Sequence, residues 1–488
     1  MGISKSPTAV AGLVFIAFVL FATFLRKRAL EAKARQDGFA PPTKYRALDP
    51  FLALDYVFKI FTDISFTQRN RLRYGKTFII EPLLGVPTIV TADPENIQKV
   101  FGSVDNDFGV FWRREPFEPF TGRGLLTEDG DGWRHPRKLY RPIFAKNNIA
   151  DLDYYGKMVN DMLEQIPGNG ETVDLHPLLL KAFMNNALHF VLGYDAMNPH
   201  PGAPLSRDGF MSRWNDGMQG VGLRIATGRL SSLLPTARFK AACSQVQSFV
   251  EFHIKQSLEN DSKTKKESQI LTESLLAQTD DRTLTRNMLV QAVIGAQDTT
   301  SVLTSNTLYL LAQHPALWQE LRVEVSKLGS DLFTFDALRT NEVIQNMLLE
   351  SLRLRPIFPA LDRVAVRNTT LPTGGGKDGA SQVLVPPGTR VQCSFYALHR
   401  EESVFGPDIE TFNPHRWKSI KPSQWEYFPF GGGPRSCMGK EKSLVEAAYV
   451  LGKLASRFKT LESRDDRPWT GVMTMTCANK HGCLVAFE

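Results

Sequence analysis

The stretch that decides the fold is Phe430-Gly-Gly-Gly-Pro-Arg-Ser-Cys-Met-Gly439, which places Cys437 directly before a predicted helix. From Lys440 to Phe458, apolar residues recur at alternating spacings of four and three, as on one face of an α-helix. Backbone N–H groups and the helix dipole favour a thiolate over a thiol at a helix N-terminus. Thiolates bind soft metals, so Cys437 is the candidate metal ligand.

The same loop has residue types suited to a flat, anionic group. Its three glycines allow a tight turn and a close backbone approach, and Arg435 could pair with an anion. The other cysteines are expected to be small, buried hydrophobic residues. They are Cys243, Cys393, Cys477 and Cys483.

Composition describes an ordinary globular protein. The chain has 488 residues, of which 42 % are hydrophobic and 22 % charged, so it can bury a large core. Its formal charge of +7 comes from dispersed basic residues without a nucleic-acid recognition motif, which argues against nucleic-acid binding. An acidic partner or an anionic membrane fits this charge better. Five cysteines without regular spacing indicate a reducing compartment.

The N-terminal segment predicts a membrane anchor. Residues 8–25 carry no charge and are nearly long enough to span a bilayer core, and Arg26-Lys27-Arg28 follows at once. The positive-inside rule then leaves the bulk of the chain in the cytosol. A cleaved signal peptide or an N-myristoylated Gly2 is the competing interpretation. The predicted organisation is a short non-cytosolic N-terminus (1–7), a transmembrane signal anchor (8–25), a basic, proline-containing linker (26–45) and a catalytic domain (46–488).

The remaining chain predicts a mainly α fold with a small β region, an α+β class. Strands are expected at 77–83 and 86–91, and strand signals return between 358 and 392. The segment from about 100 to 331 is mostly helical in pattern, and a long helix is predicted over 284–313. A C-terminal β-hairpin is predicted over 472–487, turning at Asn479-Lys-His-Gly482.

Three further patterns could support a cofactor site. Trp133 and Arg137 share one helix face and could together bind a carboxylate. The long helix contains Gly295-Ala-Gln-Asp-Thr-Thr300, where glycine and threonine can loosen the helix and admit oxygen or water. Glu350 and Arg353 form an i, i+3 pair, which on its own is common on exposed helices.

Taken together, these motifs resemble the cytochrome P450 family. Phe430, Gly433, Arg435, Cys437 and Gly439 match its haem-binding signature, in which the Cys thiolate is the axial iron ligand. The resemblance implies a P450 fold preceded by a single transmembrane helix.

The resemblance also assigns the other motifs. Trp133 and Arg137 match a propionate-binding motif, and Asp298-Thr299 matches the acid–alcohol pair that relays protons to dioxygen. Glu350, Arg353 and Arg416 match a structural triad that holds the Cys loop. One departure is Ala296, where the family usually has glycine.

A finer resemblance is to the fungal alkane and fatty-acid hydroxylase branch. It rests on Arg363-Val-Ala-Val-Arg, Leu371-Pro-Thr-Gly-Gly-Gly, Tyr396-Ala-Leu-His-Arg and Glu446-Ala-Ala-Tyr. Arg363 matches a further propionate-binding position. The same branches also contain enzymes of natural-product pathways.

The implied activity is a monooxygenase that contains haem b and inserts one atom of O2 into a C–H bond of a lipophilic substrate. No dinucleotide or flavin motif is found, so electrons from NADPH would come through a separate NADPH–cytochrome P450 reductase, with the enzyme in the endoplasmic reticulum membrane. Lys440, Lys442, Arg134 and Lys138 could attract that acidic partner. A thiolate-haem isomerase or dehydratase and a non-catalytic haem sensor are the alternatives.

Position in the chain suggests apolar substrate contacts in three segments. They come before the Trp133 helix, after the Glu350 helix and in the final hairpin. The candidates are Val110, Phe111, Phe358, Ala360, Leu361, Val472 and Met473.

Overall fold

The structure, a computed structural model, describes residues 36–102, 107–259 and 270–488. Over these ranges, no helix is both long and apolar enough to cross a bilayer. The predicted signal anchor at 8–25 and the residues before it lie outside the described part of the chain, as does the first half of the predicted linker.

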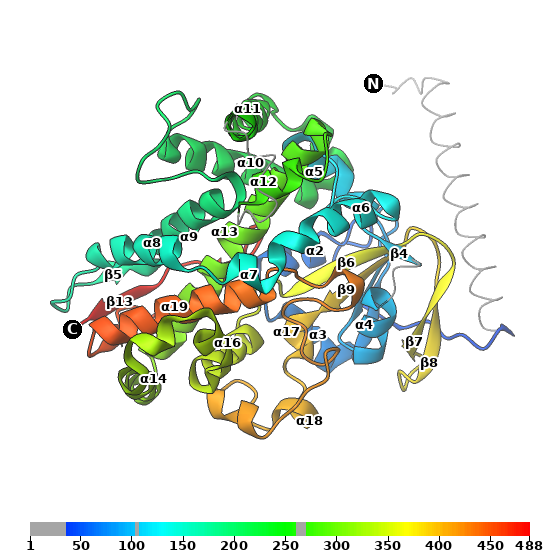
Figure 1. The fold of residues 1–488 in the computed structure, drawn as a ribbon. Helices are drawn as coiled ribbons and strands as arrows, with labels where there is room; N and C mark the ends of the chain where they lie inside the picture. The colour runs from blue at the N-terminus through cyan, green and yellow to red at the C-terminus, as the bar shows by residue number, and fades with distance from the viewer. Residues whose placement is uncertain (1–35, 103–106, 260–269) are drawn as a thin grey trace, which may run out of the picture.

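Helices make up most of the molecule and gather on one side of it (Figure 1). The central helix is α13 (Arg282–Ala312), which packs against α9 (Leu175–Leu192), α16 (Glu342–Leu354) and α19 (Lys440–Arg457). The side chain of Asp281 caps α13 by accepting a hydrogen bond from the Leu284 N–H at 2.9 Å. The predicted helices over 284–313 and 440–458 are therefore confirmed, with ends that differ by one or two residues.

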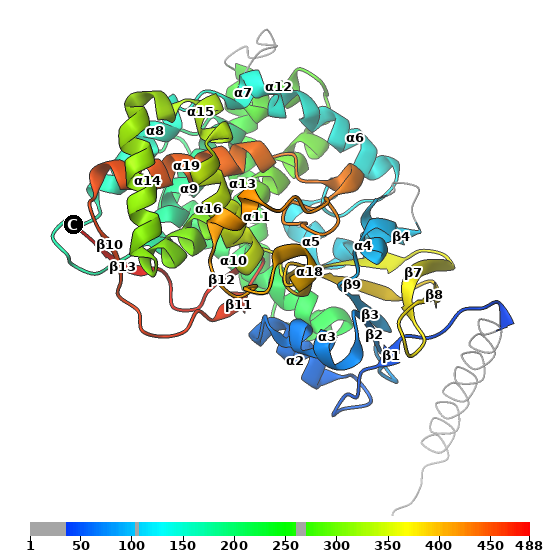
Figure 2. The ribbon, with the colours of Figure 1, turned by 90° about the horizontal axis from the view of Figure 1, so that it is seen from below.

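The other α-helices surround this centre or cover the sheet. They are α2 (Leu54–Thr62), α3 (Phe66–Tyr74), α4 (Pro94–Phe101), α5 (Arg114–Thr121), α6 (Asp131–Tyr140), α7 (Lys146–Ile149), α8 (Asp153–Glu164), α10 (Arg207–Thr227), α11 (Ala237–Glu259), α12 (Leu271–Leu276), α14 (Pro315–Leu328), α15 (Phe335–Thr340), α17 (Phe395–Leu398) and α18 (Glu402–Phe405). Viewed from below, α2 and α3 lie beside the strands, away from the helical side (Figure 2).

In the part of the chain that the structure describes, the strands form four small sheets. The largest has the order β1 (Thr43–Lys44), β2 (Thr77–Ile80), β3 (Thr88–Thr91), β9 (Arg390–Ser394), β6 (Ala360–Ala365) and β4 (Phe108–Gly109). The predicted strands over 77–83 and 86–91 pair as expected, with Thr77 opposite Thr91, although both are shorter than predicted. A separate hairpin joins β7 (Thr369–Gly375) and β8 (Ser381–Val385). The mainly α class with a small β region is confirmed.

The predicted C-terminal hairpin, which turns at Asn479–Gly482, is wrong in its strand pairing. β11 (Gly471–Met473) pairs with β12 (Cys477–Asn479), with Met473 opposite Cys477, so the hairpin turns at Thr474–Thr476. The Asn479–Gly482 segment does turn, because the Asn479 side chain donates to the Gly482 carbonyl at 2.9 Å. That turn leads into another sheet, in which β13 (Leu484–Phe487) lies between β10 (Leu461–Ser463) and β5 (Val173–Asp174).

Candidate active site

Cys437 lies in the loop between a short 3-10 helix (Gly433–Arg435) and α19. Its N–H donates to the Phe430 carbonyl at 2.9 Å, which closes the loop. The side chain is accessible to solvent, yet enough protein surrounds it to desolvate the thiol. A group that is both accessible and desolvated lies in a recess of the fold, and a ligand could approach it there.

The expected thiolate preference of Cys437 is wrong for the protein alone. Burial raises the pKa of the thiol and outweighs the Gly439 N–H and the charges of Arg137 and Lys440, which lower it. The helix start does contribute as expected, because the Gly439 N–H belongs to the N-cap of α19. Desolvation was missed because the sequence does not show what packs around the loop.

The glycines of the loop are required mainly by protein packing. Gly433 has a φ of +65°, and a Cβ there would lie 2.3 Å from the Phe101 carbonyl oxygen at the end of α4. Gly432 is packed against Phe428 and Trp425 in the same way. At Gly439, by contrast, an added Cβ would meet only ordinary contacts, the nearest at 3.7 Å. Gly433 therefore holds the loop against α4, and its expected contact with a flat group is not needed to explain it.

The centre of α13 has an open face. Gly295 is exposed, and nothing lies within 4 Å of a Cβ added there, although much of the helix on either side is buried. The Thr299 hydroxyl donates to the Gly295 carbonyl at 2.8 Å, as expected for a threonine that bonds back along its helix. The adjacent Thr300 hydroxyl lies 3.0 Å from that of Ser443, in the first turn of α19. The open part of α13 is thereby joined to the helix that follows Cys437.

Asp298 points to a different partner from its neighbour Thr299. Its carboxylate accepts a hydrogen bond from the Thr476 hydroxyl, in the turn between β11 and β12. Burial raises the pKa of Asp298, whereas the Thr476 hydrogen bond and the charge of His176 act to lower it. The acid is thus partly buried and is held by one neutral donor.

Four arginines converge beside the Cys loop. Arg137 donates to the Ser436 carbonyl at 2.9 Å, and Arg435 forms a 2.7 Å ion pair with Asp129 and stacks over the Trp133 ring at 4.6 Å. Desolvation, together with the charges of Arg113 and Arg137, lowers the pKa of Arg435 to about 10, although the charge of Asp129 acts in the opposite direction. Trp133 and Arg137 both reach the loop, as their shared helix face predicted.

Arg363 lies in the same cluster. Desolvation first, and then the charges of Arg113 and Arg435, hold its pKa well below the usual range, while Asp129 acts in the opposite direction. Arg113 was missed by the sequence reasoning. It follows the apolar segment that begins at Val110, and no motif marks it.

The residues present fit a haem. The buried arginine cluster exceeds the carboxylates that oppose it, Asp129 and Asp362, so an anionic group is needed for charge balance. The two propionates of haem would supply that charge. Across the described ranges, no three His, Cys, Asp or Glu side chains are grouped to hold a metal. Cys437, which lies beside the arginine cluster, therefore suits a metal whose other ligands come from a macrocycle.

Arg363→Gln is expected to have opposite effects on the haem-free and haem-bound states. Without an anion, the variant removes a desolvated, mutually repelling charge, so the haem-free chain should resist urea better. With haem, it removes a charge-assisted hydrogen bond, so haem transfer to apomyoglobin should be roughly tenfold faster. Arg457→Gln, at the exposed end of α19, is the control and should change neither measurement. Slower haem transfer from Arg363→Gln would contradict the assignment.

Glu350 is the centre of a buried ionic network. It is fully buried and accepts from Arg353 at 2.8 and 3.0 Å, from Arg416 at 2.9 Å and from the Trp417 indole at 3.0 Å. The Asn413 N–H donates to it as well, at 3.1 Å. The structure thus brings together the three residues predicted as a triad and adds two donors that the sequence did not indicate.

This network is connected to the Cys loop through His399. Arg353 donates to the His399 carbonyl at 3.2 Å, and the His399 Nε2 accepts from the Phe428 N–H at 2.9 Å. Phe428 lies two residues before Phe430, whose carbonyl holds Cys437. Burial lowers the pKa of His399 to about 3, which keeps the ring neutral and able to accept.

The candidate substrate contacts divide into accessible and buried side chains. Phe111 is 42 % exposed and Val472 is 36 % exposed, and Phe358, Ala360, Leu361 and Met473 are partly buried. Val110 is only 1 % exposed and its N–H donates to Asp129 at 2.8 Å, so it packs in the core. For all seven side chains, contact with a substrate stays a prediction.

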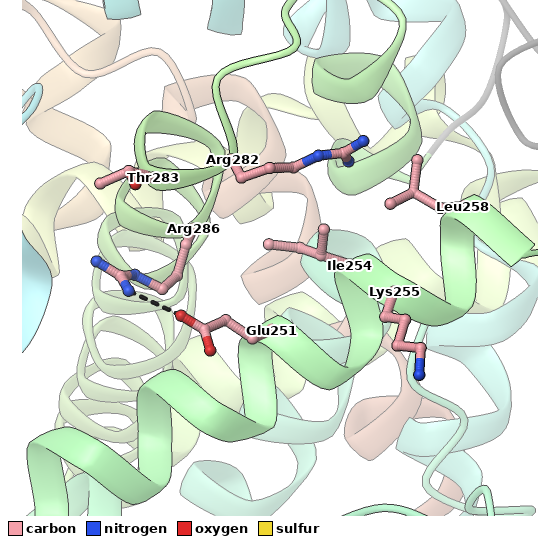
Figure 3. A pocket seen from close by; sticks show the side chains of 7 residues that line it. All are labelled: Glu251, Ile254, Lys255, Leu258, Arg282, Thr283 and Arg286. Atoms are coloured by element: carbon pink, nitrogen blue, oxygen red, sulfur yellow. Dashed lines mark hydrogen bonds and ion pairs between the residues drawn. The ribbon is translucent and has the colours of Figure 1, made fainter.

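A surface pocket lies elsewhere on α13 and does not belong to this site (Figure 3). It has a volume of about 270 Å³ and lies between α11 and the first turns of α13, where Arg286 forms a 2.7 Å ion pair with Glu251. Gly295 is nine residues beyond Arg286, roughly 14 Å along the helix axis. The lining residues are Glu251, Ile254, Lys255, Leu258, Arg282, Thr283 and Arg286.

A mainly helical fold, an accessible cysteine before α19, a buried arginine cluster and an open-faced central helix are the features that the sequence led us to expect of a haem-thiolate protein. The cytochrome P450 family pattern matches residues 61–481, which is most of the chain. The chain belongs to the cytochrome P450 family.

Individual proteins that are similar to this chain are also cytochromes P450. Cytochrome P450 monooxygenase FPY7 of Fusarium mangiferae is 32 % identical, over 94 % of this chain and 92 % of its own. Cytochrome P450 52A13 of Debaryomyces hansenii is also 32 % identical, over 89 % of this chain and 86 % of its own. The crystal structure of the cytochrome P450DA heme domain superposes with a TM-score of 0.74 over 92 % of this chain and 98 % of that chain, at 19 % identity, which supports the fold alone.

Family membership makes the chain a monooxygenase and implies a haem-thiolate cofactor, O2 as a reactant and a redox partner. The isomerase and sensor alternatives are not needed. The role of each residue and the identity of the substrate belong to the proposal below.

Proposed function

We propose that this enzyme inserts one oxygen atom from O2 into a C–H bond of a lipophilic substrate, such as a fatty acid, an alkane or a natural-product intermediate. The observation that carries this proposal is the open face of α13 at Gly295, next to Thr299 and Asp298. Accessible apolar side chains from separate segments, including Phe111 and Val472, support a lipophilic substrate.

The proposed roles follow the geometry. When bound, haem b would supply the activation of O2 and the oxygen transfer, and the Cys437 thiolate would hold its iron and donate electron density to it. Phe430, Gly433 and Gly439 shape the loop around that ligand. Asp298 and the Thr299 hydroxyl move protons on the open side of α13.

Five side chains would hold the haem carboxylates and balance their charge. The cluster exceeds its carboxylate partners, as charge balance with propionates requires. We assign Trp133, Arg137, Arg363 and Arg435 to this role from the sequence and add Arg113 from the structure. Glu350, Arg353 and Arg416 position the loop through His399.

The redox partner is proposed to be an NADPH–cytochrome P450 reductase. Arg134, Lys138 and Lys440 are exposed beside the helix and loop that flank the site, and could meet an acidic surface. Lys442 cannot join them, because its side chain is largely buried and pairs with Glu446. Of the four basic residues expected to face the reductase, Lys442 is therefore excluded.

We also propose that residues 8–25 anchor the enzyme in the endoplasmic reticulum membrane, with the catalytic domain in the cytosol. Exposed apolar side chains near the start of the described chain support contact with a membrane. They lie in two segments that are held together, because the N–H groups of Leu83 and Leu84 donate to the carbonyls of Pro50 and Phe51. The exposed apolar side chains of these two segments are Leu48, Phe51, Leu52, Leu54, Phe58, Leu83, Leu84 and Val86. Protease treatment of intact microsomes should digest all but the N-terminal segment; protection of the whole chain would contradict this orientation.

The proposed activity is tested by titrating the haem-loaded enzyme with fatty acids, alkanes and terpenoids. Displacement of water from the iron should shift the Soret band for at least one of these classes. With reductase, NADPH and ¹⁸O2, that compound should gain one labelled oxygen atom. Conversion of a substrate without O2 or NADPH would instead indicate an isomerase or dehydratase.

A further inference from the structure

Asp298 has an uncommon partner for an acid proposed to deliver protons. The Thr476 hydroxyl donates to its carboxylate, and Thr476 is only 2 % exposed. Within the described ranges, no lysine or arginine forms an ion pair with Asp298. A neutral hydroxyl from a distant part of the chain therefore fixes the direction of this carboxylate.

The turn that carries Thr476 is held by backbone hydrogen bonds. The Thr474 N–H donates to the Thr476 carbonyl at 3.1 Å, and the Cys477 N–H donates to the Ile357 carbonyl at 2.8 Å. Met473 pairs with Cys477 across the hairpin. The Thr476 side chain thus projects from a fixed backbone toward α13.

The polar and charged groups around Asp298 determine how strongly the Thr476 hydroxyl affects its carboxylate. Three elements supply polar neighbours of Asp298. On α13, the Thr299 hydroxyl is already bonded to the Gly295 carbonyl, and in the β11–β12 turn the Thr476 hydroxyl donates to the carboxylate. On α9, His176 is close enough to lower the pKa of Asp298 electrostatically. Burial lowers the pKa of His176 and so favours its neutral form, whereas the charges of Asp174 and Asp298 act in the opposite direction. A donor to the ionised carboxylate stabilises the deprotonated form against the desolvation that opposes it.

We propose that Thr476 is a positioning residue for proton delivery: its hydroxyl holds the Asp298 carboxylate in one orientation and favours its ionised form over the neutral acid. This inference rests on the proposed role of Asp298. It connects the hairpin formed by β11 and β12 to the acid of the proton path. The same hairpin carries the candidate substrate contacts Val472 and Met473. Thr476 moves no proton itself; it acts through Asp298.

The sign of the effect follows from the hydrogen bond. Without the donor, desolvation of Asp298 is less opposed, so its pKa rises and the acid stays protonated to higher pH. The freed carboxylate is also no longer held in one direction. We expect Thr476→Val to lower the product formed per NADPH by about tenfold, the scale of a lost hydrogen bond to a charged group. The pH limb that depends on Asp298 should move to higher pH.

The test uses the full-length, haem-loaded enzyme. Thr476→Val and Thr476→Ala both remove the hydroxyl, and Thr476→Ser restores it. Thr474→Val makes the same chemical change at an exposed position of the same turn and is the matched control. The direct readout, which does not depend on turnover, is the infrared carbonyl band of protonated Asp298, identified by its absence in Asp298→Asn and titrated with pH.

The expected result is a titration shifted to higher pH in Thr476→Val and Thr476→Ala, with wild-type behaviour in Thr476→Ser and Thr474→Val. An unshifted band in both hydroxyl-free variants, or an equal shift in Thr474→Val, would overturn the role of Thr476. If Asp298→Asn keeps the wild-type yield of product per NADPH, the proposed role of Asp298 fails instead. In the Asp298→Asn background, the Thr476→Val change should have no further effect on that yield.

Discussion

Cys437→Ser is expected to abolish monooxygenase activity in a protein that still folds. Cys437 is the exposed cysteine of the chain, whereas the other four cysteines are buried. A serine hydroxyl remains protonated where a thiol can ionise, so the variant cannot supply a thiolate ligand. Product formation with reductase, NADPH and O2 should fall to the background level. The carbon monoxide difference band typical of thiolate-ligated haem should be lost as well.

A matched cysteine separates this effect from general damage. Cys243→Ala removes a buried thiol on α11 and should retain both the carbon monoxide band and turnover. Circular dichroism should show equal helix content in the two variants and the wild type. A Cys437→Ser enzyme with wild-type turnover would rule out the proposed axial ligand.

Glu350→Gln is expected to destabilise the folded state by about 3–5 kcal/mol. The carboxylate is fully buried between Arg353 and Arg416, and its loss leaves two buried guanidinium groups without their shared counter-ion. Asp408 pairs with Arg416 as well but not with Arg353, so it compensates only in part. Urea unfolding of the variant should show this loss, together with low haem content because the Cys loop is no longer held through His399.

The control for this prediction is on the same helix. Glu342→Gln changes an exposed glutamate in the first turn of α16 and should shift stability by less than about 0.5 kcal/mol. If Glu350→Gln unfolded at the same urea concentration as the wild type, the ionic network would not be what holds the loop.

Local sequence patterns predicted the parts of the site that depend on short-range geometry. Trp133 and Arg137 share a helix face, and both side chains reach the Cys loop. The i, i+3 spacing of Glu350 and Arg353 likewise became a direct contact. Arg416 is 66 residues away from Glu350 and could be placed only through the family resemblance.

Features that depend on long-range packing could not be predicted. The hairpin pairing was missed because Asn479–Gly482 is a good turn sequence. The strand after that turn, β13, instead pairs with β10 and with β5, which lies about 300 residues earlier in the chain. Thr476 and Arg113 have no motif, and only the fold brings them to Asp298 and to the arginine cluster. The burial that raises the pKa of Cys437 is a tertiary effect of the same kind.

A bond between the Cys437 sulfur and haem iron is central to the proposed chemistry. Iron X-ray absorption of the purified, haem-loaded chain measures this bond directly. We predict one sulfur neighbour of the iron in the wild type and none in Cys437→Ser. An iron coordinated by nitrogen and oxygen alone in the wild-type protein would contradict the account.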